Sequence, residues 1–227
     1  VTNPVFFDLR PEKNWAIFKY LKKHNKKIFL DALATDHYYV KACLDGKTFR
    51  YSDFFVGDRP LPHPEREKML AAWIGGPNER PNIEMAQEAN GIIACLYEYY
   101  AAYQPEYADK LAYIPIPIDL SINPFHPIKS TPEVVKFFIG IQQHRTAIKG
   151  TDILLDVLRE IHDKYPHESH IQKVVSVPFD EYNKLLVDCH ILLDQLYSYT
   201  PATNALAAMA PVSYTHLRAH ETDQYLV

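Results

Sequence analysis

Between residues 134 and 210, short apolar runs alternate with segments of helical periodicity. The apolar runs, rich in β-branched and aromatic residues, predict buried strands at 134–139, 174–177 and 191–193. Apolar residues recur at helical spacing over 154–161 and 179–186, which predicts helices. A third helix is expected over 202–210, with Thr200 placed to cap it and Pro201 at its first position. This alternation predicts a parallel sheet connected by right-handed crossovers.

The first 120 residues show a similar but less regular alternation. It predicts strands at 28–33, 92–96 and 113–116, and helices at 10–27, 65–75, 83–89 and 97–109. Five prolines then fall between positions 115 and 132, which is typical of a boundary between domains. We therefore expect an α/β protein with one domain over 1–120, a Pro-rich linker over 121–133 and a second domain over 134–210.

A candidate ligand site lies in the second domain, because parallel sheets bind ligands at the carboxyl ends of their strands. The loop after the first strand of this domain carries Arg145, Lys149 and Gly150. The turn over 198–204 leads into the third helix, whose free backbone N–H groups favour anions. Two cations facing that turn predict a diphosphate or another strongly anionic ligand. The alternative is that Arg145 and Lys149 are ordinary solvated loop residues.

A second candidate lies in the first domain, where Asp36 and His37 follow the strand at 28–33. Their place beyond the carboxyl end of a strand puts them where a ligand cleft would lie. A helix cap at Thr35 or Asp36 explains the same residues.

Composition narrows the class of protein. The apolar content of 47% is ordinary for a globular core, and the net charge of -4 gives no general attraction to nucleic acid. The three cysteines are far apart, which favours reduced core thiols in a cytoplasmic protein over disulfides or a metal site. Lysines cluster at positions 19, 22, 23, 26 and 27, so they either form a solvated helix face or contact an anionic membrane surface.

The second half of the chain resembles the donor-binding domain of GT-B glycosyltransferases, in particular the family 4-like group. The matching segments are FFIG, KGTDILLDVL, VPFDEYNKLLVDCHILLDQ and NALAAMA. The resemblance covers most of residues 1–210 and implies two incomplete Rossmann-like parallel-sheet domains. It also implies that the donor diphosphate binds to Arg145, Lys149 and Gly150 and to the turn at Thr200, Ala202 and Thr203. Two glutamates that are usual in the family are replaced here by Tyr199 and Ala207. In the first domain, Ala34-Thr35-Asp36 resembles a turn of the family's acceptor-binding domain, which implies a role of Asp36 and His37 toward the acceptor.

The resemblance implies a function as well as a fold. Such an enzyme transfers a sugar from a nucleotide-diphosphate sugar to a saccharide or lipid-linked acceptor in bacterial surface polysaccharide synthesis. It needs no bound metal or other cofactor and works in the cytoplasm, at the inner face of the membrane. The alternatives are a UDP-sugar epimerase of the same fold, a GT-B relative that binds without catalysis, and an unrelated doubly wound domain. No catalytic base is evident.

The last residues, 211–227, interrupt the family pattern. Their sequence PVSYTHLRAHET resembles a translated sequencing adaptor, so we expect a non-native tail and a chain truncated at both ends. His216, His220 and Glu221 lie close together there, but they do not follow the zinc-binding HExxH order.

Overall fold

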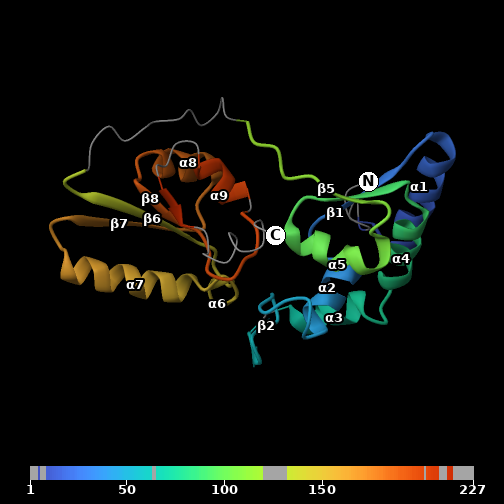
Figure 1. Cartoon of the computed structure of the whole chain (residues 1–227), viewed down its shortest axis with the longest axis horizontal. Helices are drawn as coiled ribbons and strands as arrows, with labels where there is room; N and C mark the ends of the chain where they lie inside the picture. Colours follow the sequence, from blue (N-terminus) through green and yellow to red (C-terminus); the bar gives the residue numbers. More distant parts are fainter. Residues whose placement is uncertain are drawn as a thin grey trace. The chain divides into compact units, whose positions relative to one another are not determined.

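The computed structural model divides the chain into two compact units, residues 1–116 and 117–227 (Figure 1). It describes residues 5, 9–62, 65–119, 132–201, 203–209 and 214–216, with the backbone alone for Phe179 and 214–216. Both units are mixed α/β structures built on parallel sheets, as the sequence predicts. The division falls inside the proline-rich stretch, while most of the predicted linker lies outside the described residues.

Unit 1 contains a three-stranded parallel sheet with the order β1-β4-β5. The strands are β1 (Phe29–Ala32), β4 (Gly91–Ala94) and β5 (Leu111–Tyr113), and a short hairpin is formed by β2 (Phe55–Val56) and β3 (Arg59–Pro60). The helices are α1 (Pro11–His24), α2 (His37–Leu44), α3 (Arg66–Trp73), α4 (Glu79–Glu88) and α5 (Tyr97–Tyr107). Helix α5 continues through Pro105 to Tyr107 and is not interrupted by this residue. A proline so near the end of a helix removes few backbone hydrogen bonds.

Unit 2 contains a four-stranded sheet with the order β7-β6-β8-β9, in which every pairing is parallel among the described residues. The strands are β6 (Val135–Ile141), β7 (Ser169–Val175), β8 (Ile191–Leu193) and β9 (Tyr214–His216). The helices are α6 (Thr146–Lys149), α7 (Thr151–Lys164), α8 (Phe179–Val187) and α9 (Thr203–Ala208).

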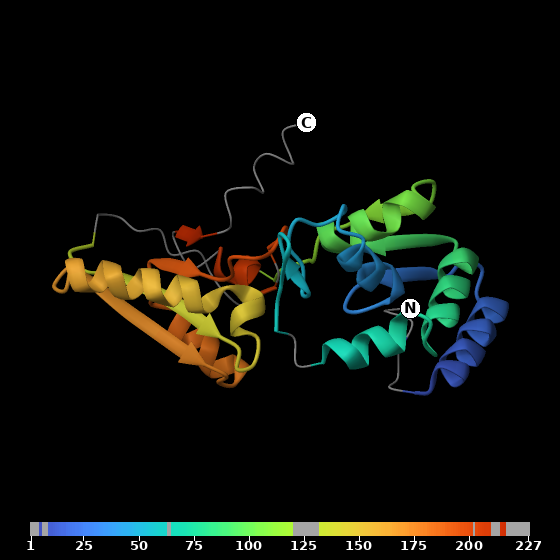
Figure 2. The ribbon, with the colours of Figure 1, turned by 90° about the horizontal axis from the view of Figure 1, so that it is seen from below.

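The sheet of unit 2 is covered on both faces. Figures 1 and 2 show α7 on one face and α8 with α9 on the other. Successive residues of the central strands therefore point into different cores: Phe138 and Leu192 pack toward α8, whereas Ile139 and Leu193 pack toward α7. Burial on both faces explains why these strands are continuous apolar runs.

Two predicted details of unit 2 are wrong. The strand predicted over 134–139 continues through Gly140 to Ile141, and Gly140 serves packing, since a Cβ there would lie 2.6 Å from the Tyr182 hydroxyl. Helix α9 begins at Thr203, so Thr200 and Pro201 precede it instead of capping and opening it. Within residues 211–227 the structure describes β9, whose backbone pairs with β8, and the non-native origin of this tail stays a prediction.

Among the described residues, no helix is long and apolar enough to cross a membrane.

Candidate functional site

A cavity of about 600 Å³ lies in unit 2 at the carboxyl ends of its parallel strands. Its walls come from the ends of β6, β7 and β8, from α6, α8 and α9, and from Ile118 and Asp119. The lining residues include Gln142, Lys149, Ser176, Tyr182, Asp194, Thr203, Asn204 and Ala207. Its volume is suited to a ligand of nucleotide size.

Two loops form the rim of the cavity beside β6. The backbone N–H of Ser176, the residue after β7, donates to Ile141 at 3.2 Å, and the Gln143 N–H donates to the Ser176 hydroxyl at 3.2 Å. Ser176 adopts a φ of 47°, which is uncommon for a residue other than glycine. These contacts connect the loop after β6 to the loop after β7.

Lys149 enters the cavity wall from the last position of the short helix α6. Gly150 follows with a φ of 67° and ends α6 in the left-handed conformation, so that α7 can start at Thr151. The Lys149 carbonyl also accepts a hydrogen bond of 2.8 Å from the Leu196 N–H, beyond β8. The backbone of Lys149 is therefore held from both sides.

Asp194 is the first residue after β8 and lies in the cavity wall, with only 4% of its surface exposed. Its Oδ1 atom accepts a short hydrogen bond from Asn204 on α9. Burial raises the pKa of Asp194 above its ordinary value, while the Asn204 hydrogen bond and the positive charge of Lys149 oppose the rise. Lys149, Asp194 and Asn204 thus form one electrostatically coupled group.

Tyr182 extends this group from α8. Its ring packs edge-on against Phe138, with ring centroids 5.0 Å apart, and its hydroxyl lies against Gly140. Burial raises the pKa of Tyr182, the negative charge of Asp194 adds to the rise, and a hydrogen bond with Asn204 opposes it. Tyr182 therefore remains a neutral hydrogen-bonding group at physiological pH.

The predicted diphosphate residues do not all reach the cavity. Lys149 and Thr203 line it, whereas Arg145 is exposed at the start of α6 and is absent from the described lining. Gly150 is buried against Leu196, and Thr200 is buried. Ala202 lies outside the described residues. Lys149 is therefore the cation of the predicted pair that the structure places in the cavity wall.

Sequence reasoning missed Asp194, Asn204 and Tyr182. A signal for Asp194 was present, because a carboxylate directly after an apolar strand lies at the ligand-binding edge of a parallel sheet. Asn204 and Tyr182 belong to helices, and their convergence on Asp194 depends on helix packing that no short motif records.

Asp36 and His37 lie in unit 1 and take part in a buried hydrogen-bond network. Asp36 is the N-cap of α2 and accepts hydrogen bonds of 2.8 Å from the Tyr39 N–H and 2.7 Å from the Tyr103 hydroxyl. The capping interpretation of Asp36 is therefore confirmed. Burial raises its pKa to about 6, although these hydrogen bonds oppose the rise.

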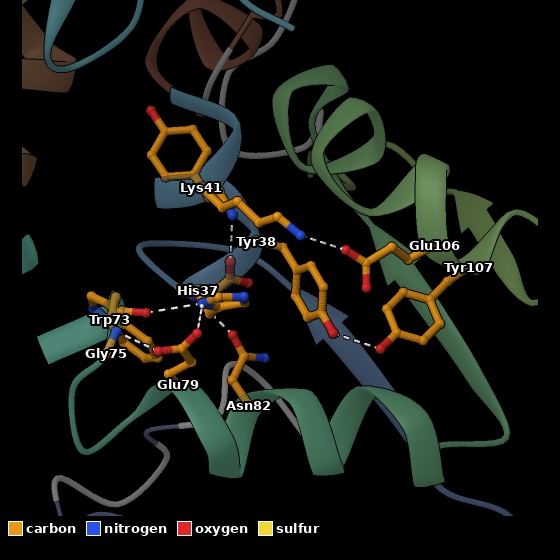
Figure 3. Close-up of polar contacts among 11 residues, drawn as sticks. His37, Tyr38, Lys41, Trp73, Gly75, Glu79, Asn82, Glu106 and Tyr107 are labelled. Carbon is orange, nitrogen blue, oxygen red and sulfur yellow. Dashed lines mark hydrogen bonds and ion pairs between the residues drawn. The ribbon is translucent and has the colours of Figure 1, made fainter. Parts of the chain in front are cut away.

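His37 connects α2 to two other segments of unit 1 (Figure 3). Its Nδ1 lies 2.9 Å from the Trp73 carbonyl and 3.6 Å from a Glu79 carboxylate oxygen, and its backbone N–H donates to Asn82 at 2.8 Å. Figure 3 also shows Tyr38 directed toward Tyr107, with 2.5 Å between their hydroxyl oxygens. These contacts give His37 a structural role, and a role toward an acceptor remains a prediction.

Other candidate features are simpler. Lys22 of the α1 lysine cluster forms an ion pair of 2.8 Å with Glu88 of α4, so this lysine connects two helices. The three cysteines are free thiols. Among the described residues, no group of three or more His, Cys, Asp or Glu side chains has the arrangement of a metal site.

Comparisons with known proteins add no relative to this description. No protein-family model matches the chain, and no curated protein matches its sequence.

Proposed function

We propose that the chain is a nucleotide-sugar glycosyltransferase of GT-B type and that the cavity in unit 2 binds the donor. The observation that carries the proposal is Lys149 in the wall of a nucleotide-sized cavity at the carboxyl ends of parallel strands. Cavities at this edge are where doubly wound sheets bind their ligands. The resemblance of the segments around β6, α7, β8 and α9 to the donor domain of this family supports the same assignment.

Lys149 is the group proposed to bind the diphosphate. Its ammonium would compensate the charge that develops on the leaving nucleoside diphosphate as the glycosidic bond breaks. Thr203 adds a hydroxyl to the same wall. Helix α9 has six residues, so its dipole is short and the proposal does not depend on it.

A second candidate function is binding of a nucleotide sugar without turnover. It is favoured by Ala207, which lines the cavity at one of the two positions where the resembled family carries a glutamate. A methyl group there can neither accept a hydrogen bond nor compensate charge.

The acceptor is proposed to be a saccharide or a lipid-linked saccharide. The lysine cluster of α1 would then contact an anionic membrane surface at the cytoplasmic face. A role of Asp36 and His37 toward this acceptor stays a prediction, because the hydrogen bonds of both residues serve the fold of unit 1.

The proposed donor site predicts that Lys149→Ala weakens nucleoside diphosphate binding. We expect a loss of about 1.5–3 kcal/mol, as for a charged hydrogen bond, in isothermal titrations with UDP and GDP. Lys184→Ala is the matched control, because Lys184 is an exposed lysine of α8 outside the described lining. Equal affinity of wild type and Lys149→Ala for the nucleotide that binds would contradict the assignment.

Product analysis separates the candidate functions. The protein is incubated with sugar-labelled UDP-glucose or GDP-mannose and a mixture of free and lipid-linked oligosaccharides. Labelled oligosaccharide would indicate a transferase and isomerised donor an epimerase. Binding with no conversion would favour the binding protein.

A further inference from the structure

The carboxylate of Asp194 is buried in the cavity wall, and one of its two oxygens is not engaged by the protein. Oδ1 accepts the hydrogen bond from Asn204, which fixes the plane of the carboxylate. Among the described residues, no donor hydrogen-bonds Oδ2. Only 4% of the Asp194 surface is exposed, but Oδ2 is not among the fully buried side-chain atoms that lack a hydrogen-bond partner, so this oxygen keeps access to the cavity that Asp194 lines. A hydroxyl donor of a ligand in the cavity can therefore reach it.

We propose that Oδ2 of Asp194 accepts a hydrogen bond from a sugar hydroxyl of the nucleotide that binds in this cavity. The inference rests on the proposed donor site and adds to it a residue that recognises the ligand. The hydroxyl belongs either to the ribose or to the transferred sugar, and both offer the same chemistry to a carboxylate.

The charges around the cavity favour a role of Lys149 toward the diphosphate and a role of Asp194 toward a hydroxyl. A carboxylate repels phosphate groups, so Asp194 does not share the diphosphate with Lys149. The two side chains are nevertheless close enough for the Lys149 charge to act on Asp194. The ligand that fits both is anionic at one point and carries a hydroxyl donor a short distance away. A nucleoside diphosphate, with or without an attached sugar, has this arrangement.

The test compares Asp194→Ala with wild type by titration calorimetry on the full chain. Three probes are used: UDP-glucose, UDP and 2′,3′-dideoxy-UDP, with the corresponding guanosine series of GDP-mannose, GDP and dideoxy-GDP. Asp194→Asn repeats the measurement with an isosteric side chain, in case alanine disturbs Asn204. Asp163→Asn, an exposed aspartate of α7, is the matched control. The usual strength of a hydrogen bond to a charged group predicts a loss of affinity of about 10-fold to 100-fold for the probe that carries the contacted hydroxyl.

The pattern across the probes decides the outcome. If Asp194 binds the ribose, Asp194→Ala weakens the binding of the sugar nucleotide and of the nucleoside diphosphate but not that of the dideoxy probe. If Asp194 binds the transferred sugar, only the affinity for the sugar nucleotide falls. Equal loss for all three probes, or no loss for any, would overturn the inference while leaving the donor site intact. Failure of the wild type to bind any probe would instead overturn the proposed function.

Discussion

Replacing Asp36 by asparagine is expected to change the pH dependence of the unfolding free energy of unit 1 by about 3 kcal/mol. Asp36 is fully buried, and its burial raises the pKa from 3.8 to about 6 despite hydrogen bonds from Tyr39 and Tyr103. A change of pKa of this size corresponds to about 3 kcal/mol of unfolding free energy. Asparagine keeps the shape and a capping oxygen but cannot ionise.

The sign follows from proton binding. The folded protein binds the Asp36 proton more tightly than the unfolded chain does, so protonation stabilises the folded state. This stabilisation is complete below about pH 3.8 and is lost as the pH rises through about 6. The unfolding free energy of wild type, minus that of Asp36→Asn, should therefore rise by about 3 kcal/mol from pH 8 to pH 3.

Tryptophan fluorescence during urea unfolding measures this difference. The two tryptophans of the chain, Trp15 and Trp73, both belong to unit 1, so the signal reports on that unit alone. Asp45→Asn is the matched control, because the hydrogen bonds of Asp45 with Thr48 and Lys47 outweigh its partial burial and lower its pKa. The unfolding free energy of wild type, minus that of Asp45→Asn, should change with pH in the opposite direction. A pH-independent difference for Asp36→Asn would show that Asp36 does not titrate in this range.

Much of the fold could be predicted because two-sided burial leaves a strong sequence signal. The strands β6 and β8 are apolar on both faces, and α7 has a regular apolar stripe. The helix α2 was not predicted, because its sequence mixes aromatic and β-branched residues, which favour strands, with residues that favour helices. It forms because Asp36 caps it and because Tyr38 packs against Tyr103 and Tyr107 of α5, which are distant in sequence.

The candidate site could be predicted only in part. The motif around Lys149 predicted a cation at this edge of the sheet, and Lys149, which directly precedes the glycine that ends α6, does line the cavity; its role in binding a diphosphate stays a prediction. Arg145 was assigned from the same stretch, but it is the N-cap residue of α6, where its backbone is not helical, and its side chain is exposed and absent from the described lining. Asp194 and Asn204 meet across ten residues through the packing of α9 on the sheet, which depends on the whole unit.

Gly150→Ala is expected to destabilise unit 2 by about 2–4 kcal/mol, for two independent reasons. Gly150 has a φ of 67°, where an L side chain is strained. A Cβ at this position would also lie 2.8 Å from Leu196 Cβ and 3.1 Å from the Tyr197 ring. Leu196 Cβ is attached to the backbone, so the segment after β8 would have to move as a whole.

Gly46→Ala separates the two contributions. Gly46 has nearly the same φ, 66°, but a Cβ there would meet no atom within 4 Å, so only the backbone cost of about 1–2 kcal/mol is expected. Unit 2 contains no tryptophan, so hydrogen exchange of the β6 and β8 amides measures its stability in Gly150→Ala, whereas tryptophan fluorescence measures the stability of unit 1 in Gly46→Ala. The excess loss of stability in Gly150→Ala is the packing contribution, and an equal loss in both variants would contradict the close approach of Leu196.

Gly150→Ala should also affect the candidate site. Because the Leu196 N–H donates to the Lys149 carbonyl, this variant should displace Lys149 and weaken UDP or GDP binding. Gly150 would then act in the site through the backbone it shapes and not through contact with the ligand.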